Sequence, residues 1–187
     1  MTRTLLLVLL TALIGCSSPD IRVTDRGASA SATFDPVAIR YGSVEVTLAT
    51  MPAYAQSEEI FVEAPDGTLS PLGPLWSDEP SRSVTLQVAQ DLSAMSGALI
   101  APEPWPFRDF ADAILDVRVN DYFVTADGAF RLSGQYFVAP EDGGPDRAEP
   151  FSIEVPIGGE AALSDIARAR TSAVAQLSRQ IATEGLR

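Results

Sequence analysis

Short alternating patterns of apolar and polar residues run along most of this chain and predict a β-sheet. The segments that alternate in this way, or that form brief apolar runs, are residues 43–48, 59–63, 98–101, 113–119, 130–138 and 151–155. The last three follow one another, with the turn pair Asp127-Gly128 and the loop 140–145 between them. Consecutive strands joined in this way predict an antiparallel meander. Gly134 lies inside one of them, which indicates a bulge or a close contact with a neighbouring strand.

A first helix is predicted in the middle of the chain, where apolar residues recur at helical spacing. It begins near Pro80, which suits a first turn because its missing N–H costs nothing there, and it ends at Gly97. We expect Ser77 or Asp78 as its N-cap. The prolines within residues 71–76 predict a rigid lead-in to this helix.

A second helix is predicted over residues 160–183. Its apolar face consists of Leu163, Ile166, Val174, Leu177 and Ile181. Arg168, Arg170 and Arg179 are expected largely off that face. Two one-sided helices and an alternating sheet bury their apolar surfaces by stacking as layers. The predicted fold class is therefore α+β, a two-layer sandwich in which two helices pack on a largely antiparallel sheet.

The beginning of the chain has the pattern of a secretory signal. A mainly apolar run at residues 5–14 follows Arg3 and leads to the pair Gly15-Cys16. As a helix, this run would reach about 15 Å, half of a hydrocarbon core of about 30 Å, so it is too short to be a permanent membrane span. Polar turn residues follow Cys16 at once, and no core could form around it.

The segment Leu13-Ile14-Gly15-Cys16 resembles the lipobox of bacterial lipoproteins. This resemblance implies that the leader is cut before Cys16 and that Cys16 is lipidated, and Ser17 after it resembles the pattern sent on to the outer membrane. We therefore predict a signal peptide at residues 1–15, a flexible tether that begins with the lipidated Cys16 and covers 16–40, and a single domain at 41–187.

The composition excludes most classes of enzyme and of electrostatic partner. The formal net charge is −12, which disfavours binding to nucleic acid or to anionic head groups. The chain has no histidine and no lysine, and its one cysteine is Cys16. The usual general base, the Schiff-base amine and a free catalytic thiol are therefore missing. We expect no metal, no cofactor and no catalytic residue.

Carboxylates are the remaining candidates for catalysis, because paired acids can hydrolyse glycosides without histidine. The candidate pairs are Glu58/Glu59, Asp78/Glu79, Asp109/Asp112 and Glu141/Asp142. A structural interpretation is favoured at each pair. Asp78/Glu79 is at a helix start, where negative charge suits the helix dipole, and Glu141/Asp142 is in a turn-rich loop. Glu58 and Glu59 point to opposite faces of a strand, and Asp109/Asp112 lie at a strand entrance. A carboxylate-based hydrolase is thus a remote alternative, and we do not expect an enzyme.

Aromatic residues next to prolines are the candidates for a partner-docking surface. Residues 102–107 contain three prolines, which forbid regular structure, together with Trp105 and Phe107. This segment either packs on the edge of the domain as a connector or faces a partner. Trp76, at the entrance to the first helix, is expected mainly as a core residue, with a partner-facing or ligand-stacking role as the alternative.

With these elements placed, the chain resembles the PqiC/YmbA family of ABC-transport auxiliary lipoproteins. The resemblance rests on Met51-Pro52-Ala53-Tyr54, Leu75-Trp76, Glu103-Pro104-Trp105-Pro106, Gly134-Gln135-Tyr136 and the terminal helix. It implies an outer-membrane lipoprotein that faces the periplasm and that contributes to envelope integrity. The partners that the resemblance implies are an MCE-domain membrane protein, the associated ABC transporter and phospholipid. The resemblance is also compatible with a homo-oligomer.

A generic assembly or stability factor for outer-membrane proteins or lipopolysaccharide would use the same kind of anchor and a similar small body. The residues do not separate this alternative from lipid transport.

Overall fold

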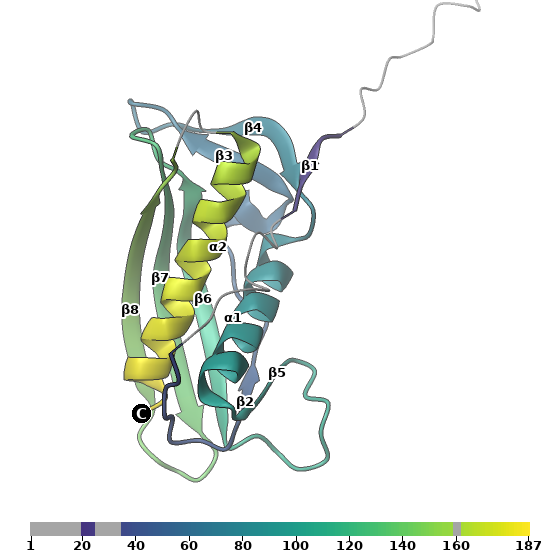
Figure 1. Ribbon diagram of the computed structural model, residues 1–187, viewed down its shortest axis with the longest axis vertical. Coiled ribbons are helices and arrows are strands. Elements are labelled where there is room, and N and C mark those ends of the chain that lie inside the picture. Colours follow the sequence, from purple (N-terminus) through teal and green to yellow (C-terminus); the bar gives the residue numbers. More distant parts are fainter. Residues whose placement is uncertain (1–19, 25–34, 159–161) are drawn as a thin grey trace, which may run out of the picture.

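The computed structural model describes residues 20–24, 35–158 and 162–187. The predicted signal peptide and Cys16 lie outside the described residues, as does most of the predicted tether. Both long helices lie on the same face of one twisted sheet (Figure 1), so the predicted two-layer α+β sandwich is confirmed. None of the helices in the described part of the chain has the length and apolar character needed to cross a membrane.

The sheet contains eight strands in these described residues. They are β1 (Arg22–Val23), β2 (Ser43–Val46), β3 (Glu59–Glu63), β4 (Leu69–Trp76), β5 (Leu99–Pro102), β6 (Ala113–Val124), β7 (Ala129–Pro140) and β8 (Arg147–Pro156). The helices are α1 (Pro80–Ser96) and α2 (Leu163–Gln180), with the shorter turns η2 (Ala53–Gln56) and η3 (Ile181–Gly185).

Strand β6 is the centre of the sheet. The antiparallel meander β6–β7–β8 lies on one side of it, as predicted. On its other side, the first half of β6 pairs in parallel with β2, which continues to β5, and the end of β6 meets β3, which continues to β4 and β1. The sheet is therefore mixed, although its longest ladders are antiparallel.

Gly134 on β7 makes the close contact that its position in the sequence predicts. The register between β6 and β7 shifts between Val119 and Asp121, opposite Gly134 and Ser133, which indicates a bulge. A Cβ atom on Gly134 would lie 2.1 Å from the backbone oxygen of Arg118. Only glycine therefore allows the two strands to approach in this way.

Residues 71–76, predicted as a rigid lead-in to the first helix, form the main part of strand β4. The strand was missed because proline has no N–H to donate to a neighbouring strand, so a segment with two prolines argues against a strand. Here the pairing with β3 is itself irregular: Phe61 faces Pro71, while Glu59 faces Leu75. Two extra residues of β4 are accommodated within this shift, and Pro74 lies inside it.

The predicted flexible tether is wrong for the described parts of residues 16–40. Strand β1 pairs with β4, and the Leu75 N–H donates to the Ile21 carbonyl over 2.8 Å. Further on, buried Val37 donates its N–H to Met95 over 2.9 Å. Backbone hydrogen bonds fix both segments to the domain, and such bonds leave no periodic pattern in a stretch this short.

The predicted helix boundaries also shift. Glu79, not Ser77 or Asp78, is the N-cap of α1, while Pro80 and Gly97 stand at its ends as expected. Helix α2 begins at Leu163, and a π-helical turn continues it to Gly185.

Candidate partner-docking groove

The loop 103–112, which joins β5 to β6, projects from one end of the domain (Figure 1). The rings of Trp105 and Phe107 pack edge to face, with their centroids 4.9 Å apart. The Trp105 indole N–H donates to the Asp109 carbonyl over 2.7 Å. Phe107 is 44% exposed, and neither ring belongs to the buried core. The loop is thus an ordered aromatic projection, since its two rings pack on one another and the indole is hydrogen-bonded within the loop.

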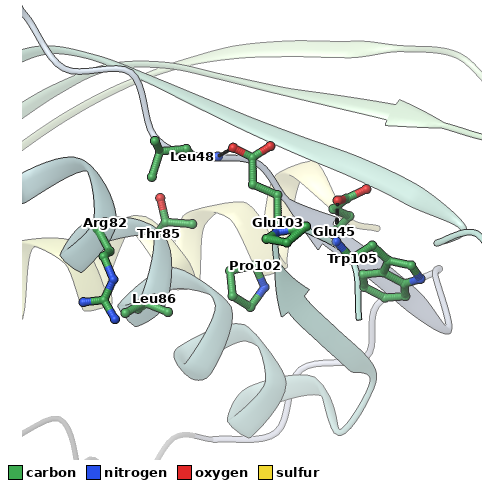
Figure 2. Close-up of a pocket in the computed structure, with 9 residues that line it drawn as sticks. Glu45, Leu48, Arg82, Thr85, Leu86, Pro102, Glu103 and Trp105 are labelled. Atoms are coloured by element: carbon green, nitrogen blue, oxygen red, sulfur yellow. Dashed lines mark hydrogen bonds between the residues drawn. The ribbon is translucent and has the colours of Figure 1, made fainter. Parts of the chain in front are cut away.

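Two glutamates fasten the start of this loop to the sheet. Glu45 on β2 accepts the backbone N–H of Trp105 over 3.1 Å, and Glu103 accepts the backbone N–H of Leu48 over 2.9 Å. Figure 2 shows both carboxylates above the same hollow. These hydrogen bonds fix the carboxylates at the edge of the hollow. In the sequence, Glu103 stood out only as part of a family motif, and Glu45 did not stand out.

The hollow is an open groove of about 560 Å³ between α1 and the start of the loop. Its lining residues are Glu45, Leu48, Arg82, Thr85, Leu86, Pro102, Glu103, Pro104 and Trp105. The lining is mainly apolar, and Leu48 is 48% exposed at its edge. Arg82 pairs with Asp78 one helical turn earlier. An open, mainly apolar groove of this kind suits the binding of a partner.

Phe110 is a surface residue that sequence reasoning missed. It lies in the same loop and is 92% exposed. The alternation of the following strand carries the signal, because Ala113, Leu115 and Val117 are buried while positions of the opposite parity point away from the helices. Phe110 lines a second hollow of the domain, together with Tyr41, and adds a further exposed aromatic side chain to the loop.

Trp76 does not belong to this surface. Its side chain is 1% exposed, and its ring packs against those of Tyr122 and Phe130 with centroids 6.1 and 6.3 Å away. The prediction of a core residue is confirmed. Its alternative role in partner docking is wrong, because the indole is enclosed between the sheet and the helices.

Most of the carboxylates considered for hydrolysis have structural partners. Glu58 pairs with Arg22, Asp78 with Arg82, and Asp142 with Arg40. Asp112 accepts the Ser43 N–H over 2.8 Å and lies with Glu141 and Asp142 around a second hollow of about 380 Å³. Across the described ranges, no group of three or more acidic, histidine or cysteine side chains is arranged to hold a metal ion.

A buried polar cluster joins the two helices, and sequence reasoning placed its central residue wrongly. Arg170 was expected off the apolar face, yet it is 1% exposed. Its guanidinium donates to Tyr122, to Gln87 and to Ser83, over 2.6 to 2.9 Å. These oxygens satisfy the buried charge, which explains how arginine is tolerated there.

Asp91 on α1 belongs to the same cluster. It accepts hydrogen bonds from Gln87 and Ser178, both at 3.3 Å. Burial raises the pKa of Asp91 to about 6, although these hydrogen bonds and the charge of Arg170 act to lower it. The cluster lines none of the grooves described above, so we assign it to packing between the helices.

Comparisons with known proteins agree with the fold. The family model of the ABC-type transport auxiliary lipoprotein component matches residues 26–182, which confirms the resemblance drawn from the motifs. An uncharacterized protein of known structure has a TM-score of 0.67 at 18% identity, covering 81% of this chain and 97% of its own. Protein XCC0632 from Xanthomonas campestris, of family DUF330, has a TM-score of 0.63 at 16% identity, covering 90% and 92%. A search of curated proteins gave no match.

Proposed function

The chain belongs to the family of ABC-type transport auxiliary lipoprotein components, and from this premise we propose that it is a non-catalytic subunit of a lipid transport system built around an MCE-domain membrane protein. The observation that carries the proposal is the ordered aromatic loop 103–112 beside an open apolar groove. Exposed tryptophan and phenylalanine are enriched where proteins bind one another. In this role the protein docks and positions its partner, and makes or breaks no bond.

We further propose that lipidated Cys16 anchors the protein in the outer membrane, with the domain facing the periplasm. Asp20 comes four residues after Cys16, so it lies at most about 14 Å away at about 3.5 Å per residue. Strand β1, which follows Asp20, is at the end of the domain opposite loop 103–112 (Figure 1). An anchor at Cys16 therefore leaves the aromatic loop on the side away from the membrane, where a partner from the inner membrane would arrive.

The test is capture of partners from solubilised membranes. We expect the tagged wild-type chain to fractionate with the outer membrane and to co-purify with an MCE-domain protein in mild detergent. Cys16→Ala should appear in the soluble periplasmic fraction or keep its leader, because the acyl chains on Cys16, at about 0.8 kcal/mol per buried methylene, account for the attachment.

Two outcomes would contradict the proposal. Recovery of a lipopolysaccharide or outer-membrane assembly factor in place of the MCE-domain protein would reassign the function. A Cys16→Ala product that is processed and still membrane-bound would remove the lipid anchor from the scheme.

A further inference from the structure

We propose that the groove beside Trp105 binds a basic, apolar segment of the partner protein, in which arginine or lysine residues flank an apolar side chain. The inference rests on the docking role proposed above and names the chemistry that this surface recognises. It depends on three features of the groove, namely an exposed apolar lining, two carboxylates without a cation and a closed strand edge.

The apolar lining comes from three parts of the chain. They are Leu86 of α1, Pro102 and Pro104 at the end of β5 and the start of the loop, and Leu48, two residues after β2. Figure 2 shows Leu48, Leu86 and Pro102 around the groove. A leucine that is 48% exposed gains stability when a partner covers it, at about 25 cal/mol for each Å² of apolar surface removed from water. The width and open shape of the groove suit an apolar side chain with its backbone at the rim.

Glu45 and Glu103 give the rim a negative charge. Backbone N–H groups hold one oxygen of each carboxylate, as described above. Among the residues that the structure describes, no arginine forms an ion pair with either glutamate, and the chain has no lysine. Arg82, the one cation in the lining, pairs with Asp78. Two oriented carboxylates therefore remain to be matched by cations from outside.

The edge of the sheet next to the groove is poorly suited to pairing with a further strand. In β5, Leu99 donates its N–H to Gly42 of the β2 side, and Glu103 donates to Val46, so alternate residues face outward. One of these outward residues is Pro102, which has no N–H to donate. Recognition must therefore rely on side chains, which makes the chemistry of the partner's side chains decisive.

Charge separates this occupant from the other candidates. A second copy carries the same net charge of −12, and its approach to this rim is opposed by like charges. A lipid phosphate is repelled by Glu45 and Glu103 in the same way. A cationic segment alone gains from both the rim and the overall charge.

The experiment is calorimetric titration of the full chain in a non-ionic detergent. The probes are two synthetic ten-residue peptides of leucine and alanine that differ only in carrying two arginines or two glutamates. We expect the arginine peptide to bind at least tenfold more tightly, and raising the sodium chloride concentration from 50 to 500 mM should weaken it several-fold.

The decisive variant is Glu45→Gln/Glu103→Gln, because glutamine keeps the acceptor oxygen that fastens the loop and removes only the charge. We expect it to weaken the arginine peptide about tenfold, as two ion pairs of up to about 1 kcal/mol each would. The matched control, Asp146→Asn/Glu149→Gln, makes the same change in net charge at exposed positions around β8 and should leave binding unaltered.

Three results of the titration would each overturn the inference. They are equal affinity for both peptides, no binding of the arginine peptide at millimolar concentration, and an unaltered affinity in the glutamine variant. A preference of the groove for phosphatidylethanolamine/phosphatidylglycerol vesicles, or self-association that Leu48→Ser abolishes, would overturn it as well. If the MCE-domain protein is still captured in such a case, the proposed function stands and the chemistry assigned to the groove alone is wrong.

Discussion

At the scale of single residues, the sequence predicts packing better than it predicts buried polarity. Trp76 and Gly134 occupy the positions that their neighbours indicate, because a large apolar ring and a missing side chain have few alternatives. Arg170 is buried although its position on the helix predicted exposure. Its three hydrogen-bond partners come from α1 and β6, more than forty residues away along the chain. The pattern of residues along α2 therefore does not indicate that these partners exist.

The same cluster predicts a pH dependence of stability that belongs to Asp91. Its pKa is about 6 in the folded protein and about 3.9 in an unfolded chain. Between these values the folded state binds the extra proton, so ionising Asp91 lowers the free energy of unfolding as the pH rises from 4 to 7. The loss over this range is about 2 kcal/mol at about 1.4 kcal/mol per pKa unit, because the titration of the unfolded chain has already begun at pH 4.

Urea unfolding of Asp91→Asn and wild type across this range measures the effect. The free energy of unfolding of the variant, minus that of wild type, should rise by about 2 kcal/mol from pH 4 to pH 7. Leu92→Ala, which removes core packing without changing charge, should give a constant difference. A flat difference for Asp91→Asn would show that the carboxylate is not held in an unfavourable environment.

At the scale of elements, regularity decides what can be predicted. The meander β6–β7–β8 and both helices were found because their repeats are long. Most of strand β4 was predicted as a lead-in to α1 because prolines interrupt it, and strand β1 was predicted as part of the tether because it has only two residues. Loop 103–112 was found as an aromatic segment, but its contacts with Glu45 and Leu48 depend on β2, nearly sixty residues earlier.

The aromatic loop itself carries a prediction. Trp105→Ala/Phe107→Ala should reduce capture of the MCE-domain protein by about tenfold or more, as expected for central aromatic contacts. The melting temperature should fall by less than about 3 °C, because the two rings pack on each other outside the core. Co-purification and thermal unfolding are to be measured on the same preparations.

Leu72→Ala provides the matched control, because Leu72 is an exposed apolar residue on β4. It should leave capture unchanged. A large drop in the melting temperature of the double variant would instead assign Trp105 and Phe107 to the structural support of the domain edge.

At the scale of the whole molecule, the two ends of the domain have different proposed roles. The β1 end is near the proposed anchor, and the end with loop 103–112 carries Phe107 and Phe110 (Figure 1). The acidic body between them opposes nucleic acid and anionic membranes as partners. The sequence predicts the anchor, the charge and the fold class, whereas only the structure shows that anchor and loop lie at opposite ends.

Cross-linking in cells tests this arrangement most directly. A photo-reactive phenylalanine is introduced at Phe110, and at Leu72 on β4, the neighbour of β1, for comparison. We expect Phe110 to form an adduct with the MCE-domain protein, and Leu72 to form none. An adduct from Leu72 alone, or adducts from Phe110 only with lipid or with further copies of this chain, would contradict docking through the aromatic loop.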